Sequence, residues 1–224
     1  MTARSEGGGP GALAALVRAV AFGAAAPVYS FLTAHDAWRA SCRELGALVP
    51  GPLVLDLGVG PGASALEPND GAERIHIGLD ISGEMLRRAA RTARVRGLHL
   101  PLVRADALRL PIRDGSLDGA TAHSVLYLLP DPLAGLSEVR RALRRGGRAA
   151  LLEPRAARPS AREAWAGGPR RLVSMLLWRG MSRIHTRFDE GELVALLTAA
   201  GLGRARAWPV LGGFGVMAVA ERTD

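Results

Sequence analysis

Short apolar runs alternate with helix-like segments along most of this sequence, which limits the folds that the chain can adopt. The runs are LVLDL at 53–57, IHIGLD at 75–80, LPLVRAD at 100–106, LDGATAHSVL at 117–126 and RAALLEP at 148–154. They are nearly continuous in apolar character, which is typical of strands covered on both faces. Strands that alternate with helices in this way predict an α/β fold, in which a doubly wound and mostly parallel sheet carries helices on both faces.

The connecting segments carry ordinary helix and turn signals. Ser82 can cap a helix over 83–96, and a helix from about 132 to 145 is expected to end at Gly146-Gly147. The last part of the chain predicts a helix at 189–200 and an antiparallel C-terminal hairpin, with strands near 204–210 and 214–221 joined by Leu211-Gly212-Gly213.

A glycine-rich turn, VLDLGVGPGASA at 54–65, follows the first predicted strand. A phosphate-binding P-loop needs a lysine, and this chain has none, so that interpretation is excluded. The dinucleotide pattern G-x-G-x-x-[GA] is formally met by Gly58, Gly60 and Ala63. Asp80 then lies where a ribose-binding acid belongs, so an NAD(P)-dependent oxidoreductase remains an alternative.

Acidic residues at three successive strand ends favour a different cofactor. Asp56 precedes the glycines, Asp80 ends the second run and Asp106 ends the third. With this set, the chain from about Tyr29 to the C-terminus resembles the class I S-adenosylmethionine-dependent methyltransferases. It is most similar to the small-molecule group that includes the ubiquinone/menaquinone-biosynthesis C-methyltransferases. The resemblance is carried by VLDLGVGPG, GLDISGEML, RADALRLPIRDGSLDGA, LRRGGRAALLEP and RFDEGELVALLTAAGL, in this order.

The resemblance implies a Rossmann-like fold and a single methyltransferase domain over 1–224. Its parts would be a disordered tail at 1–11, N-terminal helices within 12–48, a cofactor-binding core at 52–154, a substrate-side insertion at 155–187, and a final helix and hairpin at 188–222. The N-terminal helices are expected at about 12–25 and 34–48.

The resemblance also implies the roles of residues at the methionine end of the cofactor. Gly58, Gly60 and Gly62 would let the backbone approach the methionine moiety, where a Cβ would collide. Asp56 would hold the loop and offset the positive charge of the cofactor, directly or through water. His123, at the end of the fourth strand, would lie near the transferred methyl group.

Four further residues are assigned by the resemblance to the adenosine end. Asp80 would accept hydrogen bonds from both ribose hydroxyls, a task suited to an ionised carboxylate. Ile81 would cover one face of adenine. Asp106 would accept from the adenine amino group, beside the backbone of Ala107.

Methyl transfer is an in-line displacement, so much of the catalysis can come from positioning. A phenol, amine or enol acceptor also needs a base, and His123, His185 and Tyr29 are the catalytic candidates, with His35 and Tyr127 behind them. The resemblance implies that the 155–187 insertion would cap the acceptor pocket. Its apolar side chains would either line that pocket or form the buried stripe of a helix: Trp165, Met175, Leu176, Leu177, Trp178 and Met181.

The net charge of +8 raises the question of nucleic-acid binding. The arginines fall mostly on predicted helix faces, and HSVLYLLPDP does not match the N/D-P-P-Y segment of amino-methylating enzymes. A small-molecule acceptor is therefore expected, and no nucleic acid. The single cysteine, Cys42, provides no disulfide and no metal cluster, which fits the cytoplasm. Residues 12–26 are a weak secretion signal, and they favour a helix packed on the domain or in peripheral contact with a membrane.

The segment after the glycine loop departs from the family. Pro68-Asn69-Asp70-Gly71 leaves room for barely two helical turns. A relative that uses S-adenosylmethionine structurally or without methylation, such as a cyclase, therefore stays an alternative. The identity of the acceptor, the methylated atom and the oligomeric state do not follow from these residues.

Overall fold

The computed structural model describes residues 36–68, 74–165 and 168–224. Their strands form one seven-stranded sheet in the order β3-β2-β1-β4-β5-β7-β6. The strands are β1 (Leu53–Leu57), β2 (Ile75–Asp80), β3 (Leu102–Arg104), β4 (Leu117–His123), β5 (Leu143–Pro154), β6 (Gly203–Val210) and β7 (Gly215–Glu221). Strand β7 is antiparallel to both of its neighbours, and the pairs from β3 to β5 are parallel. The predicted doubly wound sheet with an antiparallel hairpin strand is confirmed.

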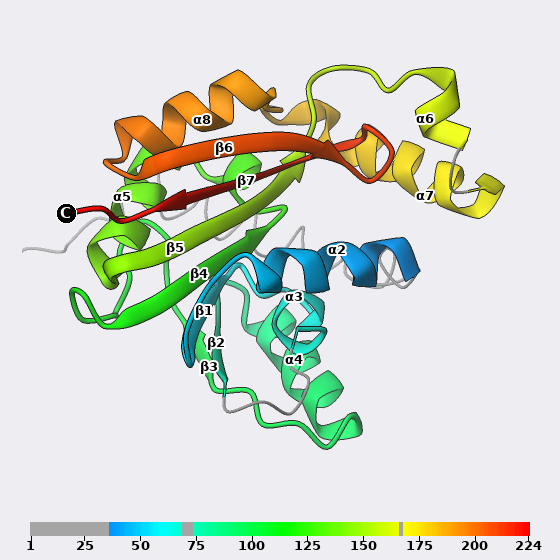
Figure 1. Ribbon diagram of the computed structural model, residues 1–224. Coiled ribbons are helices and arrows are strands. Elements are labelled where there is room, and N and C mark those ends of the chain that lie inside the picture. Colours follow the sequence, from blue (N-terminus) through cyan, green and yellow to red (C-terminus); the bar gives the residue numbers. More distant parts are fainter. Residues whose placement is uncertain (1–35, 69–73, 166–167) are drawn as a thin grey trace, which may run out of the picture.

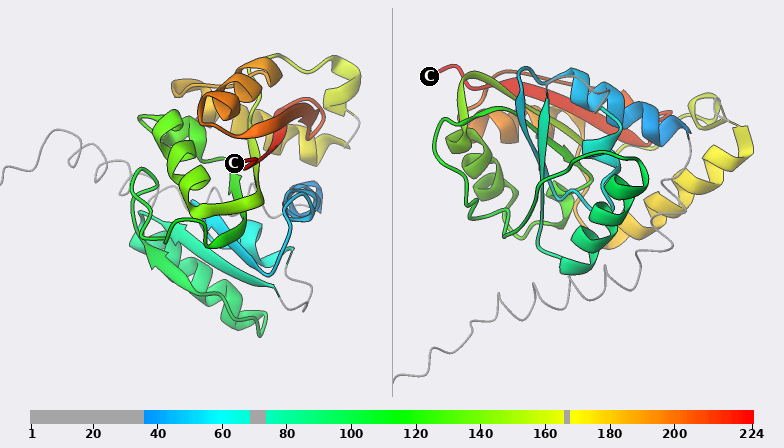
Figure 2. Two further views of the ribbon diagram at one scale, coloured as in Figure 1. Left: turned by 60° about the vertical axis from the view of Figure 1, so that its left-hand side comes forward. Right: turned by 90° about the horizontal axis from the view of Figure 1, so that it is seen from below.

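Helices cover both faces of the sheet (Figures 1 and 2). One face carries α5 and α8, and the opposite face carries α2, α3 and α4, while α6 and α7 extend beyond one end of the sheet. Their bounds are α2 (Asp36–Ala47), α3 (Ala63–Leu66), α4 (Gly83–Val95), α5 (Pro132–Ala142), α6 (Ala161–Trp165), α7 (Gly168–Met181) and α8 (Glu190–Ala199), with short 3-10 turns η1 (Leu126–Leu128) and η2 (Ser182–Ile184).

The strands form where the sequence is apolar enough for side chains on both faces of the sheet to be buried. All seven residues of β4 are buried, as are four of the five in β1. A core cluster joins these strands to Leu136 of α5 and Leu193 of α8. A second cluster on the other face joins Trp38 of α2 to Met175 of α7. The sheet is thereby fixed between two apolar layers, as a mostly parallel sheet requires.

Local signals set most helix ends within one or two residues of expectation. Ser82 caps α4 by accepting a hydrogen bond from the backbone N–H of Met85, at 3.3 Å. Helix α2 starts at Asp36, within the predicted 34–48 range. The predicted tail at 1–11 and helix at 12–25 lie outside the described residues.

The expected end of the 132–145 helix is wrong. Helix α5 stops at Ala142, and Gly146-Gly147 lies inside β5. Leu143 already pairs with Leu117, and the register then shifts before Gly119, so the glycines form an irregular stretch of strand rather than a helix stop. A Cβ on Gly147 would come within 2.9 Å of the backbone oxygen of Arg144, so this turn requires glycine.

Strand β4 also ends earlier than the predicted 117–126. It stops at His123, where Ser124 turns into the left-handed region with φ 62°. The chain then enters η1. This sharp exit carries the residues after β4 away from the strand direction and brings Val125 beside Gly58.

Candidate functional site

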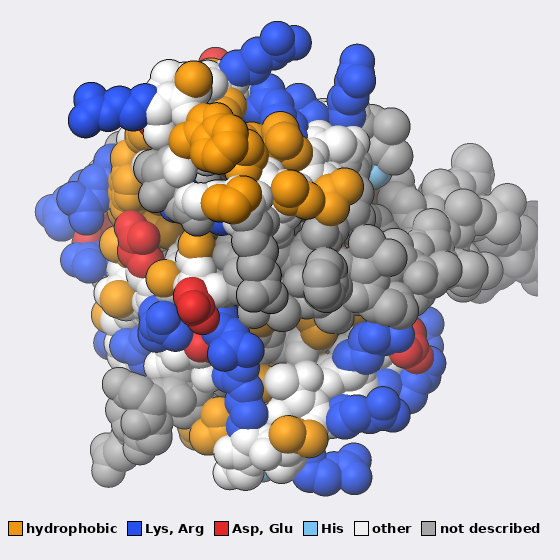
Figure 3. All heavy atoms as spheres, turned by 90° about the vertical axis from the view of Figure 1, so that its right-hand side faces the viewer, with side chains coloured by type: hydrophobic (Ala, Val, Ile, Leu, Met, Phe, Trp, Pro, Cys, Tyr) orange, Lys and Arg blue, Asp and Glu red, His pale blue; other side chains and the backbone are white. Residues whose placement is uncertain are grey.

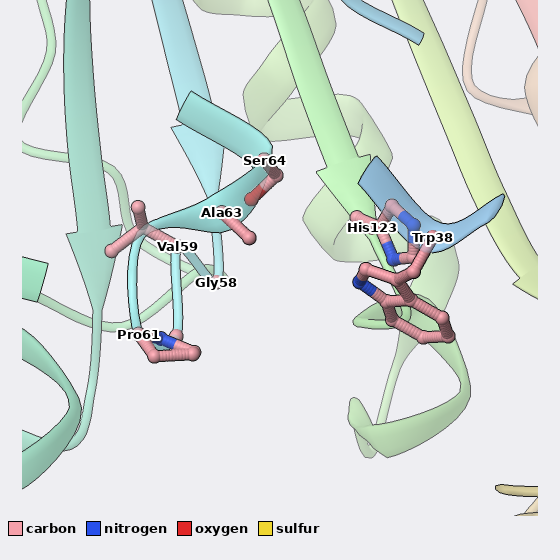
Figure 4. A pocket seen from close by; sticks show the side chains of 8 residues that line it. Trp38, Gly58, Val59, Pro61, Ala63, Ser64 and His123 are labelled. Carbon is pink, nitrogen blue, oxygen red and sulfur yellow. The ribbon is translucent and has the colours of Figure 1, made fainter. Parts of the chain in front are cut away.

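The carboxyl ends of β1 and β4 meet at one edge of the sheet, where a pocket lies against the glycine loop. Such an edge is where parallel α/β sheets bind ligands. Figure 4 shows the loop on one side of the pocket, and Trp38 and His123 together on the other. The lining residues are Trp38, Gly58, Val59, Gly60, Pro61, Ala63, Ser64 and His123.

The three glycines of the loop all have positive φ, at 62° for Gly58, 52° for Gly60 and 98° for Gly62. A Cβ on Gly58 would approach Val125 Cγ2 to 2.4 Å. A Cβ on Gly60 would meet only the oxygen of Gly58 within 4 Å, so this position has open space beside it. The conformation requires glycine at each point, and the open side at Gly60 lets a ligand approach bare backbone.

Asp56 is fully buried beneath this loop. Its Oδ2 accepts a hydrogen bond from Ser64 Oγ at 2.5 Å, and its Oδ1 accepts one from Thr121 Oγ1 at 2.9 Å. Desolvation raises its pKa to about 7, against the two hydrogen bonds, which lower it. Asp56 thus links β1 to α3 and β4. Its carboxyl is separated from the pocket by Ser64, which lines the pocket and donates a hydrogen bond to it.

Asp80 links the second strand end to the glycine loop. Its Oδ2 accepts from the backbone N–H of Gly60 at 3.0 Å, and its Oδ1 accepts from that of Ser82 at 2.8 Å. Burial raises the pKa of this carboxyl, and the backbone N–H groups oppose the rise. Each oxygen retains a lone pair, so the carboxylate can still accept two hydrogen bonds from a ligand.

The third strand end lies beside the second. The backbone N–H of Ala105 donates to the oxygen of Asp80 at 3.2 Å. Asp106 is exposed and accepts from the N–H of Leu108 at 2.9 Å. Ala107 is buried, and Ile81 is exposed at the start of the next turn. These three residues extend the edge beyond the pocket that contains His123.

His123 is buried and held at both ring nitrogens. Nε2 lies 3.3 Å from Ser41 Oγ, and Nδ1 lies 3.2 Å from Ser124 Oγ. The imidazole lies 4.4 Å from the ring of Trp38, centroid to centroid. Burial lowers the pKa of His123 to about 3, so the ring is neutral at physiological pH. It can donate or accept a hydrogen bond, but it is a weak base.

The other catalytic candidates lie elsewhere. The ring of His185 packs edge-on against that of Tyr127, with the centroids 5.5 Å apart, and His185 does not line the pocket. Burial raises the pKa of the Tyr127 hydroxyl, as does the nearby Glu153. Tyr29 and His35 lie outside the described residues.

Glu153, at the end of β5, is a residue of the site that sequence reasoning missed. It is fully buried, and its carboxylate accepts hydrogen bonds from the backbone N–H groups of Val125, Leu126 and Tyr127 at 3.0, 2.8 and 3.3 Å. Burial raises its pKa to about 7. It fixes the segment after β4, and its position at a strand end, like that of the aspartates, was the available signal.

The apolar residues of the 155–187 segment were expected either to line the acceptor pocket or to form the buried stripe of a helix. Some of them are buried and others are exposed. Met175 and Trp178 are buried, and the ring of Trp178 meets that of Trp38 edge-on at 5.4 Å. Trp165, Leu176 and Leu177 are 61%, 51% and 49% exposed. One side of α7 is therefore core, and it reaches the pocket wall through Trp38, while the other side faces outward.

Comparison with known sequences gives a family match. Residues 55–151 match the sequence profile of a methyltransferase domain. The demethylmenaquinone methyltransferase of Thermus thermophilus is 37% identical over 119 residues, which cover 52% of this chain and 53% of the relative. The chain spans about half the length of the curated relatives it matches.

Solved structures share the fold over most of this chain. An SAM-dependent methyltransferase from Thermotoga maritima superposes with a TM-score of 0.66 at 21% identity, covering 90% of this chain and 97% of its own. The cyclase SpnF superposes with a TM-score of 0.66 at 18% identity, covering 91% and 94%. At these identities the likeness concerns the fold. Residues 55–151 are therefore similar to a methyltransferase domain, and the chain shares its fold with a solved SAM-dependent methyltransferase.

Proposed function

We propose that this protein is an enzyme that transfers a methyl group from S-adenosylmethionine to a small, apolar or aromatic acceptor. The observation that carries the proposal is the position of Asp80. Its carboxylate is bound to the backbone of Gly60, at the junction of the glycine loop and β2. A ligand at this edge meets bare backbone and a carboxylate with free acceptor capacity side by side.

The residues present fit this cofactor. Asp80 has one acceptor position left on each oxygen for the two ribose hydroxyls. The open side of Gly60 leaves space for the methionine moiety, and Gly58 and Gly62 hold the loop in the required conformation. We assign Ile81, Asp106 and Ala107 to adenine, on the part of the edge beyond β2.

When bound, S-adenosylmethionine supplies a methyl group that is already activated by a positively charged sulfur. The task of the chain is then to hold and align the reactants and to exclude water. Buried Asp56 would offset positive charge in the pocket through Ser64. His123 would present a fixed, neutral imidazole beside it.

The base that would deprotonate an acceptor remains a proposal. With its pKa lowered to about 3, His123 suits hydrogen bonding better than proton removal. His185, packed on Tyr127, and Tyr29 are the other candidates.

The proposed acceptor class rests on the character of the insertion and on the relatives. Trp178 and Met175 bring apolar side chains of α7 to Trp38, which lines the pocket. Matching relatives include demethylmenaquinone methyltransferases and a 2-phytyl-1,4-naphtoquinone methyltransferase. A quinone-like acceptor is therefore the first class to test.

We also propose a peripheral contact with a membrane through the outer face of α6 and α7. Trp165, Val173, Leu176 and Leu177 are exposed there, and Figure 3 shows apolar side chains gathered on this face with basic side chains around them. Arg162, the arginine of α6, is exposed. Within the described residues, no helix has the length and apolar character needed to cross a bilayer.

Use of the cofactor without methylation is a second candidate function. Helix α3 spans only Ala63–Leu66, shorter than the two turns expected, and SpnF, a cyclase, shares the fold. An oxidoreductase stays a weaker alternative, on the formal glycine pattern alone. Turnover of S-adenosylmethionine to S-adenosylhomocysteine in the presence of an acceptor separates the first candidate from both.

The first test is calorimetric binding of S-adenosylhomocysteine and of NAD(H) to the wild type, Asp80→Asn and Asp114→Asn. We expect binding of the homocysteine product only, weakened roughly 10- to 100-fold by Asp80→Asn, because one charged acceptor is lost while the side-chain shape is kept. Asp114 is an exposed carboxylate away from the site, so its variant should bind like the wild type. Binding of NAD(H) alone, or of neither ligand by folded protein, would reject the proposal.

A further inference from the structure

Trp38 forms an aromatic wall of the pocket and is held there from two sides. Its side chain lines the pocket opposite the glycine loop (Figure 4). The centroid of the His123 imidazole lies 4.4 Å from that of the Trp38 ring, and the ring of Trp178 is nearly perpendicular to it, with the centroids 5.4 Å apart. Only 2% of Trp38 is exposed. The ring therefore cannot move aside without disturbing the core on that face.

The pocket differs from the rest of this basic chain in its lack of positively charged side chains among the described residues that line it. The chain has 29 basic residues, yet none of them is among the residues that line this pocket. His123, the one lining side chain that could become positive, is kept neutral by burial, with its pKa lowered to about 3. On the side of the glycine loop, two carboxyls are each hydrogen-bonded to a lining residue, Asp56 to Ser64 and Asp80 to the backbone N–H of Gly60. The surroundings favour a positive charge in the pocket.

We propose that Trp38 recognises the sulfonium of S-adenosylmethionine by a cation–π interaction. Tryptophan has the strongest such attraction among the aromatic side chains, and it acts over about 6 Å when the cation is shielded from water. The inference rests on the proposed function and adds a specificity determinant to the same site. Through this interaction Trp38 would contribute to the binding of S-adenosylmethionine, whose sulfur is charged, and not to the binding of S-adenosylhomocysteine, whose sulfur is neutral.

The chemistry gives this distinction a consequence. In methyl transfer the carbon–sulfur bond breaks, its electron pair stays on sulfur, and an electron pair of the acceptor forms the new bond to the carbon. The positive charge passes to the acceptor and leaves it as a proton, taken up by a base or by solvent. The sulfur thereby loses its positive charge, and the attraction to Trp38 is lost in the same step. Trp38 would thereby add affinity for the charged cofactor that the neutral product lacks.

The test compares the affinities for S-adenosylmethionine and S-adenosylhomocysteine by calorimetry, in the wild type, Trp38→Leu and Trp38→Phe. Both ligands carry the same α-ammonium group, so the ratio of their dissociation constants isolates the sulfonium. We expect Trp38→Leu to weaken S-adenosylmethionine roughly tenfold more than S-adenosylhomocysteine. Trp38→Phe, which keeps a smaller aromatic face, should change the ratio in the same direction and by less.

The outcomes separate this inference from the proposed function. If Trp38→Leu and Trp38→Phe weaken both ligands by equal factors, the wall only packs against the cofactor or holds its ammonium, and the inference is wrong while the proposed function stands. If the wild type binds neither ligand, the proposed function itself fails. Retained binding of S-adenosylhomocysteine shows that a variant is folded. Should Trp38→Leu not fold, the ratio measured for Trp38→Phe decides.

Discussion

At the scale of the residue, burial sets the charge of the groups around the site. Asp56 and Glu153 are fully buried carboxyls whose pKa values are raised to about 7, and His123 is a buried imidazole whose pKa is lowered to about 3. Each shift favours the neutral form, because a low dielectric penalises charge. The pocket therefore lies among groups that are neutral or partly neutral near physiological pH, and a bound cation would be the dominant local charge.

The raised pKa of Asp56 predicts a pH-dependent stability. An acid whose folded pKa lies above its unfolded value of about 4 binds more protons in the folded state, so its contribution to stability falls as pH rises from about 4 to 7. Asp56→Asn removes this contribution. Relative to the wild type, the variant should gain stability across that range, by an amount on the order of 4 kcal/mol.

The measurement for Asp56→Asn is chemical denaturation at several pH values in both proteins. Taking the difference between them cancels the opposing contribution of the buried histidines, which gain stability as pH rises. A difference that stays constant from pH 4 to pH 7 would show that Asp56 titrates normally in the folded protein.

The histidines give a second prediction at this scale. His123 and His76 are both buried, and their pKa values are lowered to about 3 and about 4. Both rings should stay neutral down to about pH 5, because protonation would put a charge into the core. Imidazole resonances followed by NMR during a pH titration test this. Titration of His123 near its ordinary pKa would contradict the assigned burial and would restore it as a base.

At the scale of the element, the observed helix and strand bounds differ most from those predicted by the sequence where the chain enters or leaves the sheet. Strand β5 starts early, at Leu143, and passes through Gly146-Gly147 before it becomes regular. Helix α3 is a single short turn directly after the glycine loop. At β5 the glycine signal for a helix end is overridden, because the backbone there pairs with β4. At α3 the early end agrees with the break expected at Pro68.

Gly147 and Gly180 form a matched pair that tests the first of these departures. A Cβ on Gly147 would lie 2.9, 3.0 and 3.2 Å from three backbone oxygens, whereas one on Gly180, inside α7, would meet nothing within 4 Å. Gly147→Ala should destabilise the protein by about 1–3 kcal/mol. Gly180→Ala should stabilise it by up to about 1 kcal/mol, because alanine is the better helix former. Thermal unfolding of the two variants measures both, and equal effects would argue against the strand assignment at Gly147.

At the scale of the whole molecule, the site and the apolar face lie on the same part of the fold. Helix α7 contributes Trp178 to the packing behind the pocket wall and presents Leu176 and Leu177 to the outside. An apolar acceptor partitions into lipid, so an enzyme that takes one gains by resting on the bilayer. The net charge of +8 would strengthen such a contact with anionic lipid.

The expected outcome is co-sedimentation with vesicles that contain anionic lipid, weakening as salt is added. The double variant Leu176→Ser/Leu177→Ser should bind several-fold less, since it removes apolar area from the contact face. Val95→Ser is the control, because Val95 is 82% exposed on α4, away from α6 and α7. Equal binding by all three proteins would reject this face as the contact.

The sequence by itself determined the sheet and its ligand-bearing edge. Bounds of β1 and β2 follow from the apolar runs, and Asp56, Asp80 and the glycines follow from their places at strand ends, because these patterns depend on local backbone geometry and burial. The tertiary structure alone decided the wall of the pocket. Trp38 and Ser41 reach His123 from a helix some 82 residues away in sequence, and Trp178 joins them from α7. Contacts between side chains on separate elements depend on how whole helices pack across the sheet, and no short-range periodicity encodes that.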